Sequence, residues 1–236
     1  MASCVQSHSK ADTLVIVGNG EPLSEDAMRF RLLFSGEIKA HRELDIKPPH
    51  KHDIRAYLSP QLERLWKTKA GLQRYASVIG AKARGERGEQ YPEGSLYCEE
   101  NRLAGLEYLA DLNKKLNTRF IPLIVPTFCL RCRIDVLFLR PEDTPNHILQ
   151  SGDLDNRIKT LFDAMRIPQN HEVVDDGKTH FVLLQDDSLI SELSVVGDNL
   201  LTLPGMPRVG TSDAFAVIDV QLETTEKVEG HARFIF

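Results

Sequence analysis

The residues best suited to chemistry are two carboxylates, Asp153 and Asp155, which flank the apolar Leu154 and are followed by Lys159. In an extended backbone, side chains two residues apart point the same way, so both carboxylates would share one face while Leu154 faces the core. Close carboxylates raise the pKa of one of the pair unless a cation lies between them. Such a pair at the mouth of a helix suits a divalent ion with oxygen ligands, such as Mg2+.

Each of these residues also fits a purely structural role. The side chain of Asp155 or Asn156 can cap a helix, because both accept hydrogen bonds from the free amides of a first turn. Lys159 can form an exposed i, i+4 ion pair with Asp155. The D-x-D pattern therefore predicts metal binding only in a suitable structural context.

An amphipathic helix is predicted directly after the acidic pair. Its apolar residues recur at i, i+3, i+4 and i+7, the spacing of one helical face: Ile158, Leu161, Phe162 and Met165. Runs of alternating or apolar residues predict five strands, over 29–38, 128–139, 179–185, 190–196 and 214–222. The acidic pair would then lie on a loop held by a rigid sheet, where active-site groups are common.

The motif D-L-D-N-x-x-K-x-x-x-D-A at 153–164, with a later strand that ends in Asp186-Asp187, resembles the RusA family of Holliday-junction resolvases. The similarity is closest over about 149–196. It implies a metal-binding acidic triad with three members, Asp153, Asp155 and Asp187. It also implies that Lys159 is catalytic or contacts the scissile phosphate.

The same resemblance implies the fold, the cofactor and the partners. The fold would be α+β, a mixed β-sheet packed with helices. The activity would be Mg2+-dependent endonucleolytic hydrolysis of DNA, with Mn2+ as a substitute ion, and the substrate would be a Holliday junction or other branched DNA. A homodimer would present two active sites to two strands. The metal would activate the attacking water and neutralise charge on the leaving oxygen.

The third acid of the triad stays open when the residues are considered alone. Alternation lets only one of Asp186 and Asp187 face the first pair, and the resemblance alone favours Asp187. The connection over 168–178 is longer than in the family and contains a competing pair, Asp175 and Asp176.

The predicted organisation is an N-terminal extension over 1–27 and a nuclease domain over 28–236. A basic helical insertion is expected within that domain at about 59–117. Ser59 and Pro60 predict the start of its first helix, as the N-cap and the first helical residue.

The segment 64–87 is the most basic part of the chain, and Trp66 and Tyr75 lie within it. Phosphate contacts supply most of the affinity for nucleic acids, so this segment is a candidate DNA-binding surface. A solvated helix face is the alternative. The net charge of −5 is of the wrong sign for a DNA-binding protein as a whole.

Other potential metal ligands are predicted to have different roles. His50 and His52 follow Pro48-Pro49, and we expect them to be solvated loop residues. Cys129 and Cys132 form a C-x-x-C pattern in a strand-like run without a second ligand pair, which argues against zinc.

Composition indicates a soluble, cytoplasmic globular protein. No apolar run approaches the roughly 18 residues of a membrane span, and four cysteines indicate a reducing compartment. Two further functions stay open. One is a nuclease for a different DNA or RNA structure, and the other is a non-catalytic nucleic-acid-binding or interaction module on the same scaffold.

Overall fold

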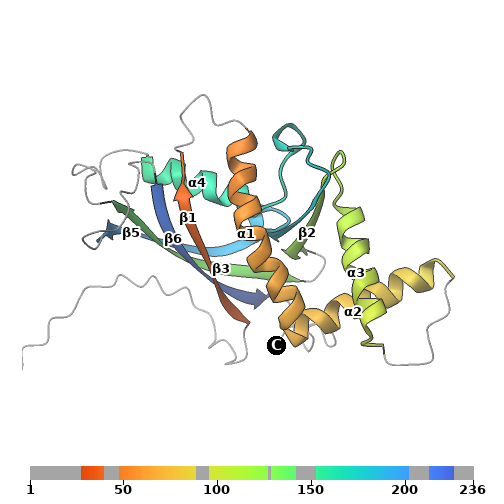
Figure 1. Cartoon of the computed structure of the whole chain (residues 1–236). Helices are drawn as coiled ribbons and strands as arrows, with labels where there is room; N and C mark the ends of the chain where they lie inside the picture. Colours follow the sequence, from red (N-terminus) through yellow and green to blue (C-terminus); the bar gives the residue numbers. More distant parts are fainter. Residues whose placement is uncertain are drawn as a thin grey trace, which may run out of the picture.

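The computed structural model describes residues 28–39, 48–88, 96–126, 129–141, 153–201 and 213–225. The predicted extension over 1–27 lies outside these residues. Figure 1 shows the elements in chain order: β1 (Arg29–Glu37), α1 (Pro48–Thr68), α2 (Ala70–Glu86), α3 (Glu99–Leu112), β2 (Arg119–Ile124), β3 (Leu130–Pro141), α4 (Asp153–Met165), β4 (Thr179–Leu184), β5 (Ile190–Leu200) and β6 (Asp213–Thr224). Two short 3-10 helices, η2 (Asn170–Glu172) and η3 (Asp187–Leu189), lie on either side of β4.

A mixed four-stranded sheet with the order β1-β6-β3-β5 forms the centre of the molecule. β6 runs antiparallel to both β1 and β3, whereas β3 and β5 are parallel. The parallel pair requires a crossover, and α4 lies within it. A mixed sheet packed with helices confirms the predicted α+β class.

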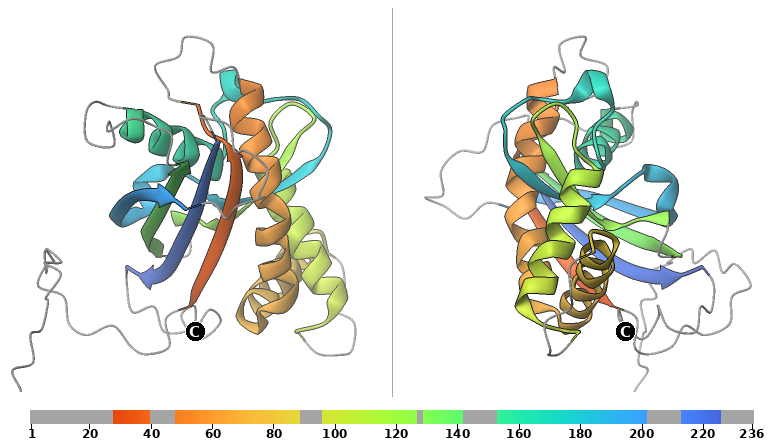
Figure 2. Two further views of the ribbon diagram at one scale, coloured as in Figure 1. Left: turned by 60° about the vertical axis from the view of Figure 1, so that its left-hand side comes forward. Right: turned by 90° about the vertical axis from the view of Figure 1, so that its right-hand side faces the viewer.

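Strand alternation decides which face of this sheet is buried. The even-numbered residues 132–138 of β3 and 30–34 of β1 are buried, as their alternation predicts. The opposite face is exposed at Leu33 and Leu137, and at Arg29 and Arg31, which both pair with Asp219 on β6. α1 and α4 pack apolar residues into this core, whereas α2 and α3 lie beyond α1, away from the four-stranded sheet (Figure 2).

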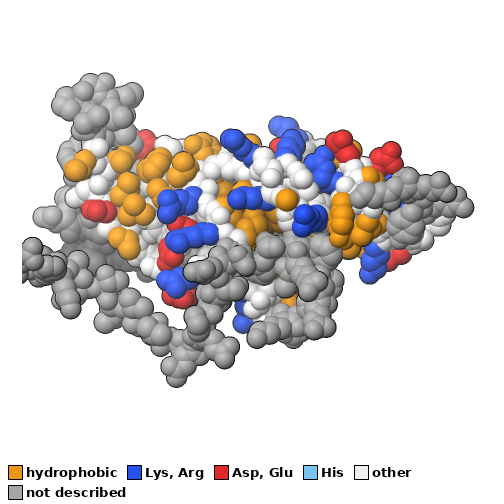
Figure 3. Space-filling view, turned by 90° about the horizontal axis from the view of Figure 1, so that it is seen from below, with side chains coloured by type: hydrophobic (Ala, Val, Ile, Leu, Met, Phe, Trp, Pro, Cys, Tyr) orange, Lys and Arg blue, Asp and Glu red, His pale blue; other side chains and the backbone are white. Residues whose placement is uncertain are grey.

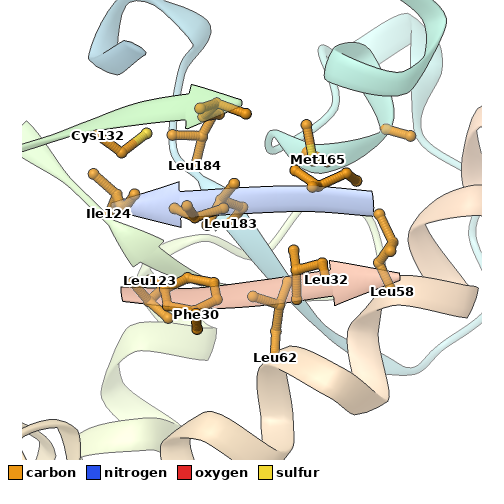
Figure 4. Close-up of a cluster of buried hydrophobic side chains, with 14 of the residues drawn as sticks. Phe30, Leu32, Leu58, Leu62, Leu123, Ile124, Cys132, Met165, Leu183 and Leu184 are labelled. Atoms are coloured by element: carbon orange, nitrogen blue, oxygen red, sulfur yellow. The ribbon is translucent and has the colours of Figure 1, made fainter. Parts of the chain in front are cut away.

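A second, two-stranded sheet pairs β2 with β4 in parallel. Pro122 lies within β2 and is buried, a position that an edge strand tolerates because proline cannot donate to the ladder. Its neighbours Leu123 and Ile124 join the common core with Leu183 and Leu184 of β4 (Figure 4). The two sheets and the helices therefore share one apolar interior.

Two predictions about the sequence of α1 are wrong: a loop at Pro48-Pro49 and a helix start at Ser59. The stretch at Pro48-Pro49 is not a loop, because it forms the first turn of α1, where missing amide donors cost nothing. Ser59 and Pro60 lie inside the helix and do not start it. A stripe of buried residues at i, i+4 spacing holds this longer helix on the core: Ile54, Leu58, Leu62 and Trp66.

The residue before Pro60 connects α1 to a neighbouring strand. The hydroxyl of Ser59 accepts a hydrogen bond from the backbone N–H of Phe181 in β4, at 2.8 Å. The side chain that was predicted to cap a helix therefore joins α1 to the smaller sheet.

α2 and α3 pack with their backbones in contact. A Cβ atom placed on Gly80 would lie 1.8 Å from the carbonyl oxygen of Asn101, and one on Gly105 would lie 1.9 Å from that of Ala76. Only glycine permits this approach at either position. Within 59–117, the described residues form the second half of α1 together with α2 and α3, and α1 begins eleven residues earlier than expected, at Pro48.

Candidate functional site

The acidic pair lies on a helix and not on an extended backbone. α4 begins at Asp153, so positions 153 and 155 are about 200° apart around its axis. The extended backbone on which a shared face of the two carboxylates depended is therefore absent from this segment. The side chain of Asp155 is exposed, and so is Lys159, one turn further along the same helix.

The apolar face of α4 is buried as predicted. Ile158, Leu161 and Met165 pack in the core, with Phe162 half-buried against it. Arg157, directly before Ile158, is also buried, and its Nη1 donates a hydrogen bond to the backbone oxygen of Ile38 at 2.6 Å. This bond ties the first turn of α4 to the segment that leaves β1.

That segment identifies the end of the sheet at which α4 begins. Glu37, the last residue of β1, pairs with Asp213 at the start of β6. Phe215, two residues further along β6, pairs with Leu139 near the end of β3. Asp155 therefore lies near the carboxyl ends of the parallel strands β3 and β5, the edge at which open α/β sheets bind ligands.

Asp186 and Asp187 lie at the opposite end. Both are exposed, and Asp186 caps η3 by accepting a hydrogen bond from the backbone N–H of Ser188 at 3.0 Å. The hydrogen bonds from Ser188 lower the pKa of Asp186. η3 leads into Ile190, which pairs with Cys132 near the amino end of β3.

In one copy of the chain, the structure does not bring Asp187 to Asp155. Leu184, three residues before Asp187, bridges Arg166, which follows α4 directly. Asp155 lies eleven residues before Arg166, or roughly 16 Å along the helix axis. Two ligands of one Mg2+ ion can be at most about 4 Å apart, because Mg–O distances are about 2.1 Å.

The competing pair Asp175 and Asp176 does not join the acids of α4. Asp175 accepts hydrogen bonds from the backbone N–H and the side-chain amide of Asn117, at 3.1 and 2.8 Å. Asp176 lies between two histidines. Its Oδ2 is 2.8 Å from Nε2 of His180 and 3.3 Å from Nε2 of His52.

His52, Asp176 and His180 form the one group of potential metal ligands found in the described part of the chain. The three side chains come from α1, from the loop before β4 and from β4 itself, and all are mostly buried. His52 was predicted to be a solvated loop residue, and that is wrong because α1 begins before it. No local sequence signal links His52 to residues more than 120 positions away.

The electrostatics of this group favour a neutral imidazole beside an ionised carboxylate. Burial lowers the pKa of His52, and the electrostatic interaction with His180 lowers it further. Burial disfavours the ionised form of Asp176, but hydrogen bonds from the backbone N–H of Lys178 and from His180 outweigh it and lower its pKa to about 2.

A buried network of charges lies beside this group. Lys51 Nζ is 2.7 Å from both Asp163 and Glu172, and Arg166 contacts the same two carboxylates at 2.7 and 3.2 Å. Burial disfavours the ionised form of Glu172, but the hydrogen bonds from Lys51 and the backbone of Gln169 outweigh it and lower its pKa to about 2. Asp163 belongs to the sequence motif, yet its contacts here join α4 to α1.

The basic segment forms the end of α1 and all of α2. Figure 3 shows Lys and Arg side chains distributed over one face of the molecule, with Asp, Glu and uncharged side chains between them. A hollow of about 430 Å³ lies between α1, α2 and the start of α3, and its lining includes Lys67, Arg74 and Tyr97 together with Arg102 and Glu99, which form an ion pair at 2.9 Å. Cations beside an aromatic ring are suited to phosphates and stacked bases.

The C-x-x-C pattern lies at the start of β3. Cys132 is buried in the core, and burial raises the pKa of its thiol to about 12, which disfavours the thiolate that metals require. Cys129 precedes the strand in a turn with a positive φ.

Comparison of the chain with protein-family models, with curated proteins and with solved structures finds no match. Among the described residues, no helix combines the length and the apolar character needed to cross a lipid bilayer.

Proposed function

We propose that this protein is a metal-dependent endonuclease that acts on branched DNA, with its reaction centre at the start of α4. The observation that carries the proposal is the exposure of Asp155 and Lys159 on successive turns of α4, at the carboxyl edge of the parallel strands. The motif 153–164 thus begins on a helix that follows a central strand, as expected for an active site built on a sheet.

Each residue has a role in this proposal. Asp155 would bind Mg2+, which would supply an activated water and charge neutralisation on the leaving oxygen, and Asp153 would share that ion only if the first residues of α4 become extended. Lys159 would contact the scissile phosphate, because its ammonium is exposed one turn from Asp155. Asp155 and Lys159 need no rearrangement of the core to meet DNA.

Asp187 can complete this centre only from a second copy of the chain. Within one copy it lies near the end of α4, which is roughly 16 Å from Asp155 along the helix axis. The proposed homodimer therefore has a specific requirement: Asp187 of one copy must approach Asp155 of the other.

The hollow at the end of α1 provides a second DNA contact. Lys67 follows Lys51 by sixteen residues on α1, which is roughly 24 Å along the axis. Since Lys51 contacts Asp163 near the end of α4, a DNA arm that passes this end of α4 would reach the hollow about seven base pairs further on. Arg74 and Arg102 would then contact its phosphates.

The test is cleavage of a labelled four-way junction with Mg2+ by the wild type, Asp155→Asn and Asp53→Asn. Asp53 is an exposed acid on α1 outside the motif and serves as the matched control. We expect paired, symmetric nicks from the wild type and the control, and a loss of at least about 100-fold in Asp155→Asn. Equal cleavage by Asp155→Asn would refute the proposed centre.

Mixed dimers test the cross-copy requirement. If Asp155 and Asp187 act together across the dimer, a mixture of Asp155→Asn with Asp187→Asn contains heterodimers with one intact site, and single nicks return. No recovery in the mixture would contradict the cross-copy arrangement. A wild type that binds junctions without cutting them would instead support the non-catalytic module, and faster cutting of flaps, single strands or RNA would support a nuclease with another target.

A further inference from the structure

We propose that His52, Asp176 and His180 form a binding site for a divalent transition metal ion of the Zn2+ type, separate from the Mg2+ centre proposed on α4. Two imidazoles and one carboxylate are ligands that Zn2+ and its neighbours in the first transition row prefer, whereas Mg2+ prefers oxygen alone. The inference does not depend on the nuclease proposal, because none of the three residues belongs to the motif on α4.

The distances between the ligand atoms fit a single small ion. One ligand atom from each residue lies within 4.8 Å of the other two. Zn–N and Zn–O bonds of about 2.0–2.1 Å in a tetrahedron place neighbouring ligand atoms roughly 3.3 Å apart. The His52–Asp176 distance is already 3.3 Å, and the His180–Asp176 distance of 2.8 Å needs to open by only about half an ångström.

The oxygen that does not face the histidines is held by the protein. Oδ1 of Asp176 accepts a hydrogen bond from the backbone N–H of Lys178 at 3.0 Å and lies 3.1 Å from the hydroxyl of Thr118, which shares its hydrogen between this oxygen and the backbone oxygen of Val174. Oδ2 is therefore directed at Nε2 of both imidazoles. Fixing a ligating carboxylate through its second oxygen is a common feature of metal sites.

The imidazoles are also held in place by their surroundings. The ring of His180 stacks on Phe120 with centroids 6.2 Å apart, and the rings of His52 and His180 meet edge to face at 4.9 Å. His52 Nδ1 is buried and has no hydrogen-bond partner among the described residues, so Nε2 carries the polar contact of this side chain. A metal ion bound to Nε2 would form a bond stronger than the 3.3 Å contact between Nε2 and Asp176.

The ion would join parts of the chain that are distant in sequence. His52 is adjacent to Lys51, which binds α4 and η2 through Asp163 and Glu172. Lys51 thus attaches the first turns of α1 to α4. A metal ion bound to His52 and His180 would attach the same turns to β4. Three protein ligands also leave one tetrahedral position for water.

The experiment uses the untagged full chain, stripped with a chelator and titrated with Zn2+ and with Co2+. We expect one equivalent to bind, a rise in the melting temperature because the ion binds only the folded chain, and the visible absorption of tetrahedral Co2+. Asp176→Asn should lose binding by at least about 100-fold, because the amide nitrogen replaces Oδ2 when Thr118 and Lys178 hold the oxygen. His171→Gln is the matched control, since His171 is an exposed histidine on η2 and should leave binding unchanged.

Further measurements do not depend on the folding of the ligand variants. X-ray absorption at the zinc edge of the wild type should show two imidazole nitrogens at about 2.0 Å. Thr118→Val, which keeps the shape of the buried side chain, should weaken binding roughly 10–100-fold. Excess Mg2+ should not displace Zn2+. Failure of the stripped wild type to bind Zn2+, or an equal loss of affinity in His171→Gln, would overturn the proposal.

Discussion

Lys51 is the residue whose removal should reveal most about how α1 is held on the rest of the fold. Its ammonium lies 2.7 Å from a carboxylate of α4 and 2.7 Å from Glu172 of η2, and all three side chains are no more than 10% exposed. Lys51→Met keeps the aliphatic stem but leaves one oxygen of Asp163 and one of Glu172 without a cation. Breaking a buried ion pair by removing one partner costs about 3–5 kcal/mol.

A second estimate, from the two hydrogen bonds that are lost, gives a similar free energy. Each lost charge-assisted hydrogen bond contributes about 1.5–3 kcal/mol, and Lys51 makes two of them. Arg166 remains bound to both carboxylates, so the loss should not exceed this range. For a chain of this size, about 3–5 kcal/mol corresponds to a fall in melting temperature of roughly 6–20 °C.

The assay is urea unfolding followed by the fluorescence of Trp66, the one tryptophan of the chain, which is buried in the core. Lys67→Met is the matched control, because Lys67 lies on the same helix and forms an exposed ion pair with Glu63 at 2.6 Å. Exposed pairs contribute about 0–1 kcal/mol. If Lys51→Met lost no more stability than Lys67→Met, the assignment of a stabilising buried network would be refuted.

Two further predictions concern acid stability and helix packing. The pKa values of Glu172 and Asp176 are lowered to about 2 in the folded chain, so their stabilisation is complete above their unfolded pKa values of about 4. It should disappear as the pH falls from about 4 to 2, and Glu172→Gln should flatten this part of the stability profile; an unchanged profile would contradict the assignment. Gly105→Ala should separate α2 from α3, because the new methyl group would lie 1.9 Å from the carbonyl oxygen of Ala76, at a cost of about 1–3 kcal/mol or more in chemical unfolding. Leu103→Ala, at an exposed position of the same helix, should change stability by less than about 0.5 kcal/mol, and equal effects of the two variants would count against direct backbone contact.

The sequence by itself determined the elements whose signals are local. Alternation in β1 and β3 and the helical spacing of Ile158, Leu161 and Met165 follow from the geometry of one strand or one helix, and each predicted face is buried. These patterns also place α4 after a central strand. They are readable because a residue's burial within a regular element depends on its neighbours two to four positions away.

Tertiary structure decided the features that depend on distant partners. α1 continues through Pro60 because four buried residues and the Ser59–Phe181 bond stabilise it, although local propensity favours a start at Ser59. The separation of Asp155 from Asp187 follows from the crossover between β3 and β5, in which α4 runs from one end of the sheet to the other.

The polar clusters show most clearly that the sequence does not reveal contacts between residues far apart in the chain. Lys51 and His52 occupy a stretch that resembles a loop, yet one enters a buried charge network and the other faces Asp176 and His180. Their partners lie more than 110 residues away in the chain, and no periodicity connects them. The sequence supplied side chains able to bind charges or metals, and the packing of α1 against α4 and β4 determined which of them meet.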